Sequence, residues 1–237
     1  MRKIGIVVFV FFCLIVISCN ERRMIQRMQE YEEGVSNPIS EAELKDAIKK
    51  YLRRIDDIVI AYERIGMWYK ILGSRYLDKK MYKNALETFE KAVEIYPENQ
   101  NLYYNIGVCA ANMAKGALDF EVRGQDVSIK YFDLAARSYK RAIELDPRYS
   151  KAIYALSVLY VFELARPEEA IPLLEGEIEG KMKPLDELFL LAQAYVATSH
   201  NEKAIAAYKK IMELSGSAKQ KKQAQENIDI ILMREKK

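Results

Sequence analysis

The stretch from Met67 to Pro97 constrains the fold most, because it carries two short apolar stripes, one in each half. Within each half the apolar residues recur at spacings of three, four or seven, which places them on one face of a helix. Gly73 and Ala85 are small where two helices must approach closely, and Tyr76 and Phe89 are large enough to fill the remaining gap. The pattern predicts two antiparallel helices that pack as a hairpin.

The same pattern restarts after Pro97, and it resembles the tetratricopeptide repeat (TPR), a helical hairpin of 34 residues. The resemblance implies an all-α solenoid of stacked antiparallel helix pairs. The packing positions that it implies are Leu72, Gly73, Tyr76, Ala85, Phe89, Ala92, Pro97, Gly107, Ala135, Tyr139, Ala142, Pro147, Tyr195, Ala204 and Tyr208.

Two units depart from the pattern. In the second, 28 residues separate Gly107 from Ala135, against 12 between Gly73 and Ala85, so we expect an inserted helical arm near 114–130 with its turn at residues 123–126. In the third, Ser157 replaces the usual glycine, Glu177 replaces the usual alanine and Pro172 falls inside the second helix. Because proline removes a helical hydrogen bond, we expect a kink or a change of curvature there.

The segments before and after the repeats predict two further helices. Ser40 followed by Glu43 is a capping-box pattern that starts an amphipathic helix. A lysine-rich amphipathic helix ends the chain, as a solenoid's terminal cap should. The expected order is a leading helix at 40–63 over the exposed face of the first repeat, TPR units at 66–99, 100–149, 150–184 and 185–217, and a capping helix at 218–237.

The N-terminus predicts export. Arg2 and Lys3 precede an apolar run from Ile4 to Ile17, which as a helix would be about 21 Å long. That is too short to cross a bilayer and is typical of a signal peptide. The run ends in Val16-Ile17-Ser18-Cys19, which resembles the lipobox of bacterial lipoproteins, so the resemblance implies cleavage after residue 18 and acylation of Cys19, with palmitate as one such acyl group. An uncleaved anchor, or a secretory signal with an incidental cysteine, is the alternative.

Residues 19–39 are polar, with few large apolar groups, and predict a flexible tether. The formal charge of +3 falls to +1 once Arg2 and Lys3 leave with the signal, so no strong field remains to attract nucleic acid. The protein is therefore expected to be exported and lipid-anchored to the inner or outer bacterial membrane, with its repeats in the periplasm.

The chain lacks the motifs of catalysis. His200 is the only histidine and lies in a predicted turn, and no Cys/His/Asp cluster has metal-ligand spacing. No glycine-rich phosphate loop and no Ser/His/Asp set appears. Cys109 lies on an apolar face and is expected to be a packing residue. We therefore expect no enzymatic activity, no cofactor and no metal.

In the TPR family the first helix of each pair lines a concave groove. At the corresponding positions this sequence is apolar and aromatic, which favours a contact surface. The groove residues implied are Lys70, Ser74, Tyr104, Val108, Tyr154, Val158, Phe162, Phe189 and Gln193. The alternative is that the chain's own N-terminal or terminal helix partly fills the groove.

The sequence thus favours a membrane-anchored lipoprotein whose solenoid binds a protein or peptide as a scaffold at the cell envelope. A second reading is a ligand-binding accessory component of a periplasmic, TRAP-type solute transport system, in which the aromatic groove holds a small apolar ligand. A surface adhesin is a third reading, and the sequence does not choose the partner among these.

Overall fold

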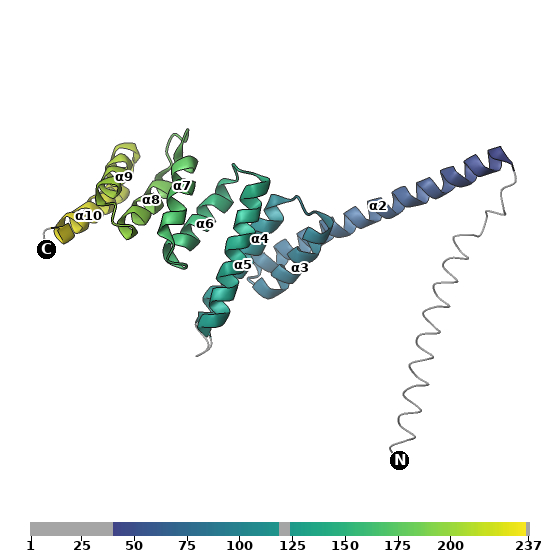
Figure 1. The fold of residues 1–237 in the computed structure, drawn as a ribbon, viewed down its shortest axis with the longest axis horizontal. Coiled ribbons are helices and arrows are strands. Elements are labelled where there is room, and N and C mark those ends of the chain that lie inside the picture. Colours follow the sequence, from purple (N-terminus) through teal and green to yellow (C-terminus); the bar gives the residue numbers. More distant parts are fainter. Residues whose placement is uncertain (1–39, 119–123, 236–237) are drawn as a thin grey trace, which may run out of the picture. The chain divides into compact units, whose positions relative to one another are not determined.

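The structure, a computed structural model, describes residues 40–118 and 124–235 (Figure 1). The expected signal peptide, Cys19 and the tether at 19–39 lie outside the described residues. The described residues fall into two compact units that divide between Ala61 and Tyr62. Every regular element in the described ranges is an α-helix, and none of these helices is long and apolar enough to span a membrane.

Helix α2 (Glu41–Asp78) begins with the expected capping box. The backbone N–H of Glu43 donates to Ser40 Oγ at 3.2 Å, and the backbone N–H of Ser40 donates to Glu43 Oε2 at 3.1 Å. The sequence predicted a leading helix that ends at residue 63 and a separate repeat helix. Instead, α2 runs through this position without a break, because the residues from Ala61 to Trp68 include no proline and keep the apolar pattern going.

The second compact unit begins at Tyr62 within α2 and continues through helices α3 to α10, which follow one another as antiparallel neighbours (Figure 1). They are α3 (Tyr82–Ile95), α4 (Gln100–Leu118), α5 (Gly124–Leu145), α6 (Ser150–Phe162), α7 (Pro167–Ile178), α8 (Leu185–Ala197), α9 (Asn201–Leu214) and α10 (Ala218–Glu235). Each contacts the next, and α6 also contacts α8. The fold is an all-α solenoid of helix pairs.

Three of the helix pairs share one tight turn. Lys80, Ala165 and Ser199 each lie two residues before the second helix of a pair and have positive φ angles of 58°, 52° and 60°. In each turn the following residue donates its backbone N–H to the carbonyl of a tyrosine near the end of the first helix, at 2.8–2.9 Å. These tyrosines are Tyr76, Tyr160 and Tyr195. Such left-handed turns end a helix while satisfying its last carbonyls.

The helices within a pair approach closely through small residues. A Cβ placed on Gly73 would lie 2.6 Å from Phe89, and one on Gly107 would lie 2.5 Å from Tyr139, so both positions exclude a side chain. In the third unit Leu174 takes the place of the aromatic residue, and Ser157 replaces glycine with its hydroxyl donating to the carbonyl of Ile153 at 2.8 Å. A smaller partner accompanies a larger residue, so the pair keeps its packing density.

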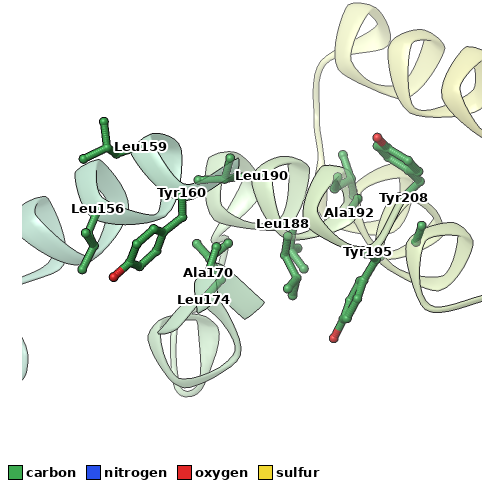
Figure 2. Packing of buried hydrophobic residues seen from close by; sticks show 14 of the residues in the cluster. Leu156, Leu159, Tyr160, Ala170, Leu174, Leu188, Leu190, Ala192, Tyr195 and Tyr208 are labelled. Carbon is green, nitrogen blue, oxygen red and sulfur yellow. The ribbon is translucent and has the colours of Figure 1, made fainter. Parts of the chain in front are cut away.

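The buried side chains form two clusters. One gathers residues of α3 and α4, including Phe89 and Leu102, and the other extends from α4 to α10. Figure 2 shows part of the larger cluster, in which Tyr160 of α6 lies beside Ala170 and Leu174 of α7. Of the expected packing residues, Ala85, Phe89, Ala92, Ala135, Tyr139, Ala142, Tyr195, Ala204 and Tyr208 are buried.

Three expected packing residues are exposed. Leu72 is 40% exposed, whereas Ile106, Leu156 and Leu191 at the same place in later units are buried. The difference has a simple reason, since those three lie on a face that a preceding repeat covers and Leu72 belongs to the first repeat. Pro97 and Pro147 are also exposed. They follow the ends of α3 and α5, where proline acts by stopping a helix rather than by packing.

The second TPR unit, made of α4 and α5, has long helices. Helix α4 has 19 residues and α5 has 22, against 12–14 in α3, α6, α7, α8 and α9. The turn expected at 123–126 is wrong in part, because α5 already begins at Gly124. The added segment is not solvated throughout. Ala114 and Ser128 are buried, so the base of this helical arm belongs to the core.

The third unit accommodates its unusual residues without a break in α7, which continues through Pro172. Glu177, at the usual alanine position, is buried with a side-chain exposure of 7%. Its carboxylate pairs with Lys181, whose ammonium group also lies 2.8 Å from Glu187 Oε1 on α8. A lysine therefore links two carboxylates from adjacent helices and offsets the cost of burying one of them.

Candidate functional site

The described residues form a cavity of about 270 Å³ on the side of the solenoid where α6, α8 and α10 meet. Tyr154 and Phe162 of α6 and Phe189 and Gln193 of α8 line it, and all four were expected to line a groove from the sequence. Their separation along α6 and α8 shows why. The i and i+8 residues of α6, and the i and i+4 residues of α8, lie on one face of each helix.

The aromatic part of the cavity is accessible. Phe162 is 56% exposed and Tyr154 is 37% exposed. Phe189 is half-buried and packs edge-on against Tyr208, with their ring centroids 6.1 Å apart. Phe189 is thus held against the core, whereas most of the Phe162 side chain is open to a ligand.

The polar part of the cavity can form directional hydrogen bonds. Asp186, Gln193, Gln220 and Gln223 contribute a carboxylate and three amide groups. The amide oxygen of Gln220 already accepts a hydrogen bond from the Ser215 hydroxyl at 2.6 Å, so Gln220 offers its N–H groups. Burial raises the pKa of the Tyr154 hydroxyl, and the carboxylates of Asp186 and Glu187 raise it further, so Tyr154 stays neutral and can donate a hydrogen bond. An amide both donates and accepts, which suits the N–H and C=O groups of a peptide backbone.

Five of the expected groove residues lie outside this cavity. Tyr104 of α4 packs against Tyr139 and Tyr149, with ring centroids 5.9 and 5.6 Å away, and burial raises its pKa. Val108 and Val158 are half-buried against the larger core cluster. These three positions are therefore partly occupied by packing within the chain.

The two remaining residues, Lys70 and Ser74, lie in the C-terminal part of α2. Lys70 places its ammonium nitrogen 5.4 Å from the centre of the Tyr96 ring, a cation–π contact. The Ser74 hydroxyl donates to the carbonyl of Lys70 at 3.0 Å, a bond within its own helix. Neither residue lines the cavity.

Sequence reasoning missed four lining residues, namely Asp186, Leu190, Gln220 and Gln223. Asp186 and Leu190 could have been found, because Asp186 lies three residues before Phe189 and Leu190 lies three residues before Gln193 on the same helix. Gln220 and Gln223 belong to α10, which was expected to cap the solenoid with a polar face. The terminal helix thus contributes two residues to the wall of the cavity.

Two further features of the described residues bear on reactivity, namely possible metal ligands and the thiol of Cys109. No group of three or more potential metal ligands occurs there. Cys109 is buried, and burial raises the pKa of its thiol to about 12, so it is protonated at neutral pH and poorly nucleophilic. That the chain is not an enzyme stays a prediction.

Comparison with known proteins identifies the helix pairs as a known repeat. Residues 65–99 and 188–217 match the sequence profile of the tetratricopeptide repeat. A TPR repeat-containing protein of Borreliella burgdorferi is 26% identical over 196 residues, covering 82% of this chain and 83% of that protein. The chain therefore contains tetratricopeptide repeats, and the resemblance of its sequence to that repeat is confirmed.

Solved structures share the fold. A MamA fragment from Desulfovibrio magneticus RS-1 superposes with a TM-score of 0.60 at 17% identity, covering 73% of this chain and 86% of that one. YrrB, described as a TPR protein with an unusual peptide-binding site, has a TM-score of 0.55 at 19% identity over 76% of this chain and 87% of its own. These likenesses show a shared helical-repeat fold.

Proposed function

We propose that this protein is a lipid-anchored scaffold whose α6–α8–α10 cavity binds an extended segment of an envelope protein. One observation supports the site above others: the cavity combines accessible aromatic rings with three amide side chains on facing helices. Aromatic side chains supply contact area at low entropy cost, and the amides can hold a peptide backbone in register. A TPR fold with a peptide-binding site, as in YrrB, is a precedent for this use of the architecture.

The composition of the cavity favours a particular kind of segment. An apolar side chain fits against Phe162 and Phe189, and a neighbouring lysine or arginine would lie near the Asp186 carboxylate. The volume of about 270 Å³ is below the range of roughly 300–1,000 Å³ typical of sites that enclose a small ligand. This size suits one or two side chains of a protein better than an enclosed solute.

The membrane anchor rests on the sequence. The basic start, the short apolar run and Cys19 together support acylation, and the resulting anchor would hold the solenoid at the membrane surface. Two or more acyl chains are needed for stable attachment. The anchor can be tested alone by comparing the membrane fraction and the mass of the N-terminal peptide for wild type and Cys19→Ser. A Cys19→Ser chain that stays in the membrane fraction would contradict the proposal.

The groove is tested by crosslinked pull-down from native membranes. A Tyr154→Ala, Phe162→Ala variant removes two exposed rings, so its fold should survive. The matched control is Met182→Ala, which removes an apolar side chain that is 89% exposed and does not line the cavity. We expect one envelope protein to be recovered with wild type and control and lost with the cavity variant.

A second variant keeps the volume and changes only the charge. Gln223→Glu adds a carboxylate at the rim of the cavity, and it should strengthen binding of a basic segment or weaken binding of an acidic one. Recovery of the same partners, in the same amounts, with all of these variants would show that the cavity is not the binding site.

A further inference from the structure

Helix α2 carries an unbroken seam of apolar residues with the spacing of a coiled coil. The residues follow one another at intervals of four and three in strict alternation, which is a heptad pattern. We call this set the α2 seam; it consists of Leu44, Ile48, Tyr51, Ile55 and Ile58 within residues 40–61, and the sequence of the same helix keeps the register at Tyr62 and Ile65.

Every residue of the α2 seam is exposed. The exposed fractions range from 37% at Tyr51 to 59% at Ile58. A monomeric soluble surface rarely presents so many large apolar side chains in one row. The 38 residues of α2 would extend over about 57 Å, well beyond the usual length of a helix in a globular domain.

The period of the pattern indicates what kind of surface fits it. A period of 3.5 sustained over three heptads keeps the same seam facing one partner helix, which must carry the same repeat. Leu52 and Val59, which are 55% and 50% exposed, border the seam on one side and widen its apolar surface. A second copy of α2 presents such a seam by definition.

The charges on either side of Ile55 favour one orientation of that second copy. The nine residues before it include Asp46 and four basic residues, and the nine after it include Arg64 and three acidic residues. The two halves therefore carry net charges of +3 and −2. In a parallel pair, like charges would face each other, whereas an antiparallel pair would bring the basic half of each helix beside the acidic half of the other.

We propose that the α2 seam forms an antiparallel coiled coil with the α2 seam of a second copy of this chain. Self-association through a seam is closed and two-fold symmetric, so it ends at the dimer. It covers the exposed apolar residues of one seam with the identical residues of the other. No residue that lines the α6–α8–α10 cavity belongs to the α2 seam. The proposal does not depend on what that cavity binds.

The test uses the full chain in detergent, with its mass measured by sedimentation equilibrium at matched density. Wild type should form a dimer. Ile55→Glu puts an unpaired carboxylate into the seam and should weaken the dimer at least about tenfold. The matched control is Ile60→Glu, because Ile60 is 48% exposed on the same helix but lies outside the seam. A monomeric wild type, or equal loss of the dimer in both variants, would overturn the proposal.

Orientation is tested with single cysteines and a short bismaleimide. In an antiparallel pair, Ile55→Cys lies near the two-fold axis and should crosslink to itself, whereas Leu44→Cys lies far from its own copy and should not. Wild type gives the background from its own cysteines. Efficient self-crosslinking of Leu44→Cys would show a parallel pair and overturn the antiparallel assignment. Raising the salt concentration should weaken the dimer, since the charges that set its orientation are exposed.

Discussion

Gly73 and Phe89 are in direct contact across the first helix pair, and a Cβ on Gly73 would lie 2.6 Å from Cε1 of that ring. No carbon–carbon contact in a packed core is that short, so the ring can pack against this helix only because position 73 has no side chain. Gly107 and Tyr139 repeat the arrangement one unit later, at 2.5 Å.

This contact predicts a large effect of substitution. Gly73→Leu should lower the free energy of unfolding by about 3 kcal/mol, because overpacking drives the two helices apart. Urea unfolding followed by circular dichroism measures it. The control is Gly116→Ala in α4, where an added Cβ meets nothing within 4 Å. This substitution should stabilise the helix by up to about 1 kcal/mol. Equal midpoints for wild type and Gly73→Leu would contradict the packing described here.

The ion pairs of Lys181 predict a second effect. Lys181→Met should leave the buried carboxylate of Glu177 without its partner and destabilise the protein by about 1–2 kcal/mol, less than for a fully buried pair because Lys181 is partly exposed. Lys222→Met is the comparison, since Lys222 and Glu226 form an exposed pair and the loss should be below about 0.5 kcal/mol. Chemical denaturation of both variants decides between them.

Alkaline pH should destabilise the fold through Tyr195. Burial raises the pKa of this tyrosine to about 12, and the Glu175 carboxylate that accepts its hydrogen bond raises it as well. Below pH 10 the hydroxyl is protonated in both states, and its contribution to stability is complete. Between pH 10 and about 12 the unfolded chain loses the proton first, so the free energy of unfolding falls as the pH rises.

Thermal midpoints measured from pH 9 to 12 test this pH dependence. Tyr195→Phe removes the titrating group and should show a shallower decline than wild type over pH 10–12. Glu175→Gln keeps a hydrogen-bond acceptor without the charge and should give an intermediate slope. An identical slope in wild type and Tyr195→Phe would assign the alkaline loss to other groups.

Cys109 should be unreactive in the native protein. Its side chain is fully buried, and burial raises the pKa of the thiol to about 12, so almost no thiolate is present at pH 8. Treatment with iodoacetamide at that pH, followed by peptide mass mapping, should leave Cys109 unmodified in the folded state and alkylated in urea. Rapid native labelling would show that α4 opens readily.

Several elements could be predicted from the sequence because they depend on residues close together in the chain. The capping box at Ser40 and Glu43, and the apolar faces of the repeat helices, follow from spacing alone. The chain reversals at Lys80, Ala165 and Ser199 could not be found in this way, because each uses a left-handed conformation at a residue other than glycine. The neighbouring tyrosine carbonyl that accepts the next N–H stabilises that conformation, and only the folded turn supplies it.

The residues expected in the groove also separate into those that follow from local spacing and those that depend on tertiary packing. Spacing along the chain is enough to predict that Tyr154, Phe162, Phe189 and Gln193 share faces of two helices, because helical periodicity sets which residues point the same way. That Tyr104 and Val108 pack within the chain, and that Gln220 and Gln223 of α10 line the cavity, depends on the folded arrangement of the helices. The physical reason is that a side chain's surroundings depend on how far successive helix pairs rotate and where the last helix docks. Those quantities are set by packing between residues distant in sequence.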